Sequence, residues 1–218
     1  MKRLNLLFLI VCLIVGALNG CGEDDDDNSS NESNGKIRGE YEVINELPEK
    51  HSLETVIFEE VINFGCPHCN NFRLLSRDLK EQYKGRLILI DIPVLFRGQS
   101  DAPLRLYYVA KSLGKEEEAK DTIFDAKYIE ELDVFDPDVI KDIAISMGIG
   151  TTYEQKAQSQ EIDQAIEAGE QKCVNYAITA VPTIVIAETL KMMPTGSMEA
   201  FVGSLPETLD DLLKPIFH

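Results

Sequence analysis

The chain has 218 residues and a formal charge of −17 at pH 7, from 38 acidic and 21 basic residues. A chain of this length, less a targeting segment and a tail, has room for one domain with a sizeable core. Its negative charge would be repelled by phosphate backbones, so we expect no nucleic-acid partner; the charge chiefly favours solubility.

The N-terminus predicts export. Lys2 and Arg3 precede an apolar run over residues 6–18, which is shorter than the roughly 18 residues that a membrane-spanning helix needs. A basic start followed by a short apolar run is typical of a signal peptide. We therefore expect residues 1–20 to be removed and the rest to be extracytoplasmic, in a bacterial periplasm or at the outer face of the cell membrane.

A membrane anchor is expected directly after this segment. Residues 18–21, Leu-Asn-Gly-Cys, resemble a bacterial lipobox, whose cysteine is lipidated and becomes the mature N-terminus; Asn19 departs from the small residue usual there. Ordinary signal cleavage, or a chance cysteine at position 21, is the alternative. Lipidated Cys21 would carry two acyl chains, enough for stable attachment. Residues 21–40, acidic and rich in Asn and Ser, are expected to be a disordered tether for a domain at 41–218.

A buried strand leads into the most informative motif of the chain. Residues 55–64 (T-V-I-F-E-E-V-I-N-F) are rich in β-branched and aromatic side chains. Glu60 falls on the same strand face as Phe58 and Ile62. Two interpretations stay open: Glu60 lies in water at a sheet edge, or it is a partly buried carboxyl with a raised pKa that can exchange a proton with Cys69.

The motif itself is Cys66-Pro67-His68-Cys69, two cysteines that can form a reversible disulfide. Pro67 suits the first position of a helix, which makes Cys66 the N-cap and predicts a helix running toward Tyr83. There the Cys66 sulfur faces free N–H groups and the positive end of the helix dipole, which favours its thiolate. Cys69, one turn on, is close enough to close the disulfide but points into the packing.

Two other uses of this motif are disfavoured. A structural zinc site needs four ligands, and the chain has no second C-x-x-C and no histidine at a usual ligand spacing. Covalent haem attachment requires a histidine after the second cysteine, where this chain has Asn70. We therefore expect no metal and no cofactor beyond the cysteine pair.

The remainder of the chain alternates short strands with helices. Caps, glycines and apolar runs predict, in order, a strand at 86–91, helices at 101–113, 115–127, 136–147 and 153–175, a hairpin of 183–186 with 190–193, and a helix at 206–213. Thr151 or Thr152 is the expected cap of the fourth helix. The hairpin opens on Val181-Pro182, and a proline in this position belongs at a strand's first residue or at a sheet edge.

Together these features resemble the DsbA family of extracytoplasmic thiol-disulfide oxidoreductases. The resemblance covers about residues 40 to 214 and is carried by the Cys-Pro-His-Cys motif, Phe72 just after it, Glu60 six residues before it, and Val181-Pro182. It implies an α/β, thioredoxin-like fold: a central mixed sheet flanked by helices, with a helical insertion at about 97–175.

The resemblance also implies roles for residues. Cys66 would be the attacked and attacking thiol, Cys69 the resolving thiol, and His68 a stabiliser of the Cys66 thiolate. Glu60 would be the buried acid, and Pro182 a cis-proline that shapes substrate docking. The implied partners are reduced or unfolded secreted proteins and a DsbB-like, quinone-linked membrane protein that re-oxidises the pair.

Other functions remain open at this point. The same motif could run in the opposite direction, in a disulfide reductase or isomerase or a thiol donor for cytochrome c maturation. A non-enzymatic alternative is a binding lipoprotein with a thioredoxin-like fold, although the intact thiol pair argues against it. Of the remaining cysteines, Cys12 would leave with the signal peptide, and Cys173 is expected to be an inert buried thiol or, alternatively, part of a regulatory or intermolecular disulfide.

Overall fold

The computed structural model describes residues 35–215. The expected signal peptide, the lipidation site Cys21 and most of the tether therefore lie outside the described residues. The folded part begins before the expected boundary at residue 41, because Ile37 is fully buried and Arg38 forms an ion pair with Asp211 at 2.9 Å. The predicted range of the tether, residues 21–40, thus extends a few residues into the folded domain.

A five-stranded mixed sheet forms the centre of the domain, in the order β1-β5-β4-β2-β3. Its strands are β1 (Glu42–Val43), β2 (Val56–Ile62), β3 (Leu87–Pro93), β4 (Thr183–Ile186) and β5 (Leu190–Met192). The pair β2 and β3 is parallel, and all other neighbours are antiparallel. The strand that leads into the cysteine motif therefore lies inside the sheet, while β3 forms one edge.

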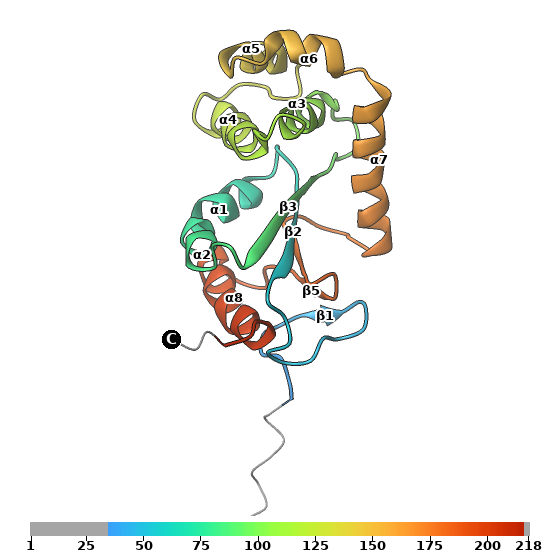
Figure 1. Cartoon of the computed structure of the whole chain (residues 1–218). Coiled ribbons are helices and arrows are strands. Elements are labelled where there is room, and N and C mark those ends of the chain that lie inside the picture. Colours follow the sequence, from blue (N-terminus) through green and yellow to red (C-terminus); the bar gives the residue numbers. More distant parts are fainter. Residues whose placement is uncertain (1–34, 216–218) are drawn as a thin grey trace, which may run out of the picture. The chain divides into compact units, whose positions relative to one another are not determined.

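Helices cover both faces of this sheet (Figure 1). One face carries α1 (Pro67–Leu75), α2 (Arg77–Gln82) and α8 (Met198–Leu212), and the other carries α7 (Gln160–Asn175). Phe72 of α1 and Phe201 of α8 pack with Phe58 of β2 in one core cluster. This packing holds α1 against one face of the sheet, the face toward which Phe58 and every second side chain of β2 point.

Four further helices, α3 (Ala102–Lys111), α4 (Glu116–Tyr128), α5 (Pro137–Ser146) and α6 (Gly150–Lys156), gather beyond one end of the sheet (Figure 1). They enclose a second apolar cluster, which also contains Cys66 and Cys69. The start of α5 follows the expected capping: the Asp136 carboxylate accepts the Asp138 N–H at 2.9 Å. The first turn of α1 thus lies in the insertion core, and its next turn, at Phe72, in the sheet core.

Several element boundaries differ from the sequence prediction. The helix expected to reach Tyr83 is broken at Ser76, whose hydroxyl donates to the Arg73 carbonyl. The helix expected over 153–175 is two helices, because Ser159 adopts an extended conformation between them; Thr151 and Thr152 lie inside α6 and cap nothing.

The last helix and the first strand also differ from the prediction. α8 starts eight residues before Pro206, where Ser197 accepts the Ala200 N–H at 3.1 Å. It runs through the proline because its buried face, which includes Leu205 and Leu209, continues on both sides and offsets the missing N–H. The short strand β1 was not predicted.

Candidate redox site

Cys66 is the N-cap of α1, as predicted, and lies in extended conformation just before Pro67. Its sulfur accepts a hydrogen bond from the Cys69 backbone N–H at 3.4 Å. Hydrogen bonding from the Cys69 side chain, opposed by burial and aided by the backbone N–H groups of Cys69 and His68, lowers the pKa of Cys66 to about 6. Much of this thiol is therefore ionised at neutral pH, as a reactive thiol requires.

Cys69 has the opposite environment. It is fully buried, and the hydrogen bond to Cys66 together with burial raises the pKa of its thiol far above the usual range. Both cysteines are free thiols in this structure. The pair thus combines an acidic thiol at the helix start with a protonated thiol inside the core.

The two residues between the cysteines are exposed. Pro67 occupies the first helical position. The charge of His68 is the smallest of the named contributions that lower the Cys66 pKa, behind the hydrogen bonds at the helix start. The Cys69 thiol therefore contributes most to stabilising the Cys66 thiolate, the backbone N–H groups of the first turn come next, and the charge of His68 adds to them.

The Val181-Pro182 peptide bond is cis, as predicted, and lies against the cysteine motif although 115 residues separate Val181 from Cys66. The Cys66 thiol donates to the Val181 carbonyl at 3.7 Å. Pro182 and His68 line the same open cavity, with a volume of about 600 Å³, whose other wall is formed by residues 193–199. The acidic Cys66 thiol and this open groove therefore lie side by side.

Glu60 lies in the interior strand β2, next to Asp91 of β3 and Ile184 of β4. It is 3% exposed, so the interpretation as a solvated edge residue is wrong. Burial raises the pKa of its carboxyl to about 7, opposed by the charge of Lys120. The raised pKa that we considered for Glu60 is thus present.

Comparison with known proteins agrees with this geometry. The model of the family described as DSBA-like thioredoxin domain matches residues 71–206, which is more than half of the chain. The chain belongs to this family. The matched region starts just after the cysteine motif, so the motif and the family match are independent observations that agree.

Individual relatives carry the same assignment. The chain is 27% identical over 164 residues to a thiol:disulfide interchange protein DsbA of Burkholderia cepacia, covering 72% of this chain and 75% of that protein. It is 24% identical to the protein of that name from Pseudomonas aeruginosa, of which the alignment covers 61%. This chain is therefore a DsbA-like thiol-disulfide oxidoreductase.

Solved structures show the same fold. The oxidoreductase DsbA from Xylella fastidiosa superposes with a TM-score of 0.64 at 17% identity, covering 71% of this chain and 84% of that chain. Proteus mirabilis DsbA (C30S), solved with a non-covalently bound peptide PWATCDS, gives a TM-score of 0.62 at 19% identity, covering 79% and 94%. The mixed sheet with its helical insertion is therefore a DsbA-like thioredoxin fold.

Sequence reasoning missed two charged residues of this DsbA-like site. The ammonium of Lys120, from α4, lies 2.8 Å from Asp91 and 3.7 Å from Glu60. A signal was present in both cases: Asp91 interrupts the apolar run of residues 87–93, and Lys120 lies on a helix face with Ile123 and Phe124. Each would have been noticed as a charge in an apolar pattern.

Asn63 is a third missed residue, and it shapes the loop before Cys66. Its amide nitrogen donates to the Val94 carbonyl and to the Gln99 side chain, both at 2.7 Å, while its oxygen accepts the Gly65 N–H at 2.8 Å. A Cβ on Gly65 would lie 3.0 Å from Phe135 and 3.1 Å from Asn63. The loop therefore needs a fully bonded Asn63 and no side chain at Gly65.

Cys173 of this DsbA-like enzyme is half-buried near the end of α7, and burial raises the pKa of its thiol to about 11. A thiol with this pKa is a weak nucleophile at neutral pH, which fits the expectation of an inert cysteine. Within residues 35–215, no group of three or more metal-binding side chains is close enough to hold an ion. No described helix has the length and apolar character to cross a membrane.

Proposed function

We propose that this enzyme is an extracytoplasmic oxidant that donates its disulfide to reduced secreted or envelope proteins. The observation that carries the proposal is the contrast between the two thiols, with the Cys66 pKa lowered to about 6 and the Cys69 pKa raised. A thiol of low pKa is a good leaving group and stabilises the reduced enzyme. Transfer of the disulfide to a client with ordinary thiols is therefore favoured.

The exchange has two steps. A client thiolate attacks the Cys66 sulfur of the oxidised enzyme, which breaks the Cys66–Cys69 bond and leaves a mixed disulfide and a Cys69 thiolate that takes up a proton. A second client thiolate then attacks the client sulfur of the mixed disulfide and releases Cys66 as a thiolate. The client loses two electrons and two protons; the enzyme keeps both electrons and one proton, and the other proton enters solution.

Client docking is proposed at the groove beside Cys66. Its lining includes Val181, Pro182, Met193 and Met198, so it offers apolar surface next to the acidic thiol. An extended segment around a client cysteine fits an open groove of about 600 Å³. The Proteus mirabilis relative was solved with a cysteine-containing peptide, which supports this class of substrate.

The cellular setting is part of the same proposal. The N-terminal signal and Cys21 point to a lipid-anchored protein at the outer face of a bacterial membrane. The family resemblance adds a DsbB-like, quinone-linked membrane protein as re-oxidant. In a bacterial host fed labelled palmitate, the protein should take up label and fractionate with membranes, and Cys21→Ala should lose both; an unlabelled, soluble protein would contradict the anchor while leaving export intact.

The direction of exchange is tested by equilibrium with glutathione. A reduction potential well above that of thioredoxin, at about −270 mV, is expected for an oxidant. A strongly reducing value would overturn the proposal in favour of a disulfide reductase or a thiol donor for cytochrome c maturation. An intermediate value, combined with activity on scrambled disulfides, would favour an isomerase.

A further inference from the structure

A cavity with a volume of about 400 Å³ lies between the helical insertion and the edge of the sheet. Its walls are formed by the edge strand β3, by α3 of the insertion and by α7. It shares no lining residue with the groove beside Cys66 that we propose for clients, the client groove. A volume of this size lies within the usual range of pockets for small organic ligands.

Small and apolar side chains form most of the cavity wall. β3 contributes Ile90 and Ile92, and α7 contributes Ala165, Ala168 and Gly169. The three residues of α7 are three and four positions apart, so they lie on one face of the helix, and their small size leaves the space between the elements open. A ligand that fills this space therefore needs an apolar body.

Gly169 makes room for the hydroxyl of Tyr108, which comes from α3. A Cβ on Gly169 would lie 2.9 Å from the Tyr108 hydroxyl oxygen. The φ of Gly169 is not in the left-handed region, so the space and not the backbone conformation requires glycine here. Glycine destabilises a helix interior relative to alanine. The helix α7 therefore loses some stability at the point where this hydroxyl lies.

The Tyr108 hydroxyl is a buried donor without a partner. Tyr108 is 8% exposed, and the hydrogen bonds of tyrosine hydroxyls within residues 35–215 belong to Tyr41, Tyr83 and Tyr176. Burial raises the pKa of Tyr108, so the hydroxyl keeps its proton and can donate it in a hydrogen bond. Because buried polar groups normally have partners, this hydroxyl indicates a ligand that accepts a hydrogen bond.

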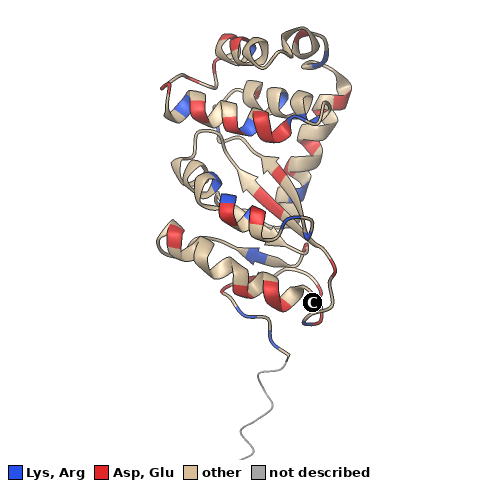
Figure 2. Cartoon of the chain, turned by 60° about the vertical axis from the view of Figure 1, so that its left-hand side comes forward, with Lys and Arg blue, Asp and Glu red and all other residues tan. Residues whose placement is uncertain are grey.

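Three of the four charged side chains that line the cavity are already paired within the protein. Strands β2 and β3 carry acidic positions and no basic ones, so the cations of these pairs come from helices (Figure 2). The pairs are Asp91 with Lys120, at 2.8 and 2.9 Å, Lys172 with Glu59, and Glu161 with Lys156, at 3.8 Å. These lining charges are therefore compensated.

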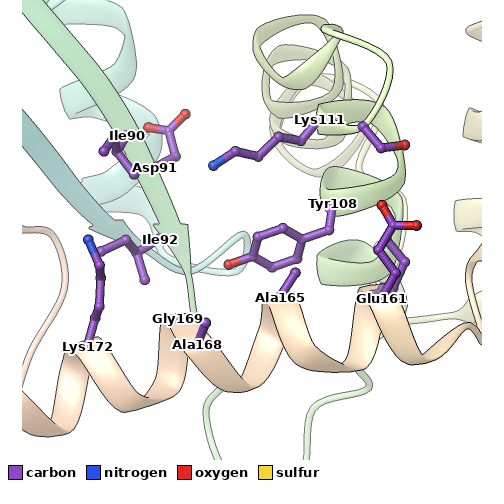
Figure 3. A pocket seen from close by; sticks show the side chains of 12 residues that line it. Ile90, Asp91, Ile92, Tyr108, Lys111, Glu161, Ala165, Ala168, Gly169 and Lys172 are labelled. Carbon is purple, nitrogen blue, oxygen red and sulfur yellow. The ribbon is translucent and has the colours of Figure 1, made fainter.

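Lys111, the fourth charged side chain, forms no ion pair within residues 35–215. Its ammonium lies 6.0 Å from the centre of the Tyr107 ring, at the outer limit of a cation–π contact. Lys111 and Tyr108 are three residues apart on α3, and both side chains extend toward β3 (Figure 3). Glu170, whose charge also reaches Tyr108, lines a different cavity. One uncompensated positive charge thus remains beside the free hydroxyl.

We propose that this cavity binds a small organic monocarboxylate with an apolar chain. The carboxylate pairs with Lys111 and accepts the hydrogen bond of Tyr108, while the chain lies between the isoleucines of β3 and the small residues of α7. A single uncompensated cation matches one negative charge. Because α3 belongs to the insertion and β3 to the sheet, the bound ligand bridges these two parts of the domain. No thiol takes part, so the site is a function beyond disulfide exchange.

The test is a titration of the nitrogen-15-labelled full chain with octanoate, followed by the backbone amide signals in NMR spectra. The signals of Ala165, Ala168 and Gly169 should shift and saturate at millimolar octanoate, as expected for a ligand of about ten non-hydrogen atoms. The signal of Gly196, which lines the client groove, should not move. Octanamide has the same shape without the charge and should bind about tenfold more weakly.

Two substitutions separate the contribution of the charge from that of the hydroxyl. Lys111→Met should weaken octanoate binding about tenfold and leave octanamide binding unchanged. Tyr108→Phe should weaken the binding of both ligands several-fold, because each has an oxygen that accepts the hydrogen bond. It should not lower the free energy of unfolding of the unliganded protein, because the hydroxyl has no partner there. The matched control is Lys115→Met: Lys115 pairs with Glu118, does not line the cavity, and its removal should leave the affinity unchanged.

An apolar pocket without an anion site gives different results. Equal affinities for octanoate and octanamide, or unchanged octanoate binding by Lys111→Met, would overturn the assignment of a carboxylate. Shifts confined to the client groove, or no saturable shift at millimolar octanoate, would overturn the site itself. A loss of stability in unliganded Tyr108→Phe would show that the hydroxyl has a partner within the protein, which also contradicts the proposal. None of these outcomes bears on the proposed direction of disulfide exchange, which the glutathione equilibrium tests separately.

Discussion

Two adjacent glutamates of β2 show how the two faces of one sheet differ in this protein. Glu59 points toward α7, where the Tyr176 hydroxyl donates to it at 2.7 Å and Lys172 forms an ion pair with it. Glu60 points toward α1, lies beside Lys120, and has one oxygen without a hydrogen-bond partner among residues 35–215. Both carboxyls are buried. The difference shows that burial alone does not decide how a carboxyl of this strand is paired: both oxygens of Glu59 have partners, whereas only one oxygen of Glu60 faces a charged group.

The largest effect should come from the thiol on the α1 face. Cys66→Ser should abolish disulfide exchange and remove the thiol that reacts with iodoacetamide with a midpoint near pH 6. Glu59→Gln, on the opposite face of the sheet, should keep this reactive thiol and its midpoint. If Cys66→Ser still shows a thiol that reacts with iodoacetamide with a midpoint near pH 6, Cys69 has the low pKa and our assignment of roles is wrong.

Substitutions on the α7 face should change the stability of the protein and not its rate of disulfide exchange. Lys172→Met leaves Glu59 as a buried carboxylate without its cation, which should lower the free energy of unfolding by about 3 kcal/mol, with the Tyr176 hydrogen bond limiting the loss. Urea unfolding measures this loss. Lys172→Arg is the matched control and should recover most of it. A fall in exchange rate under folded conditions would contradict the separation of the two faces.

Glu60 should make the stability of the protein pH-dependent. Its pKa is raised from 4.5 to about 7, so between these values the native state holds a proton that the unfolded state has lost. Stability should therefore fall as pH rises from about 4.5 to 7, by up to about 3 kcal/mol relative to Glu60→Gln. Urea titrations of both proteins across this window measure the difference. A constant difference would show that Glu60 does not titrate there.

The smallest effect is expected at His68, which is exposed and adds only its charge to the Cys66 thiolate. His68→Leu should raise the pKa of Cys66 slightly and make the disulfide less oxidising, because the thiolate loses a nearby positive charge. Thiolate absorbance against pH and the glutathione equilibrium check the two quantities. Equal values in both proteins would leave the hydrogen bonds from the Cys69 thiol and from the backbone N–H groups as the whole cause of the low Cys66 pKa.

The sequence predicted those features of the fold that depend on residues adjacent in the chain. Pro67 after Cys66 determines the helix start and the N-cap sulfur, and the β-branched run before it gives a strand. Breaks inside helices were harder to predict, because at Ser76 and Ser159 a single polar residue outweighs helix propensity that continues on either side. At Pro206 the opposite happened: tertiary packing of one apolar face carries the helix through a residue that locally disfavours it.

By itself the sequence determined the helix start at Pro67, the position of Cys66 as its N-cap and the strand that carries Glu60, while the cis-proline at 182 followed from the family resemblance. Only the tertiary structure decided what surrounds Glu60. Its partners Asp91 and Lys120 come from an edge strand and from the helical insertion, 31 and 60 residues further along the chain. The pKa of a buried acid depends on charges within a few ångströms in space, and separation along the chain does not reveal which charges these will be.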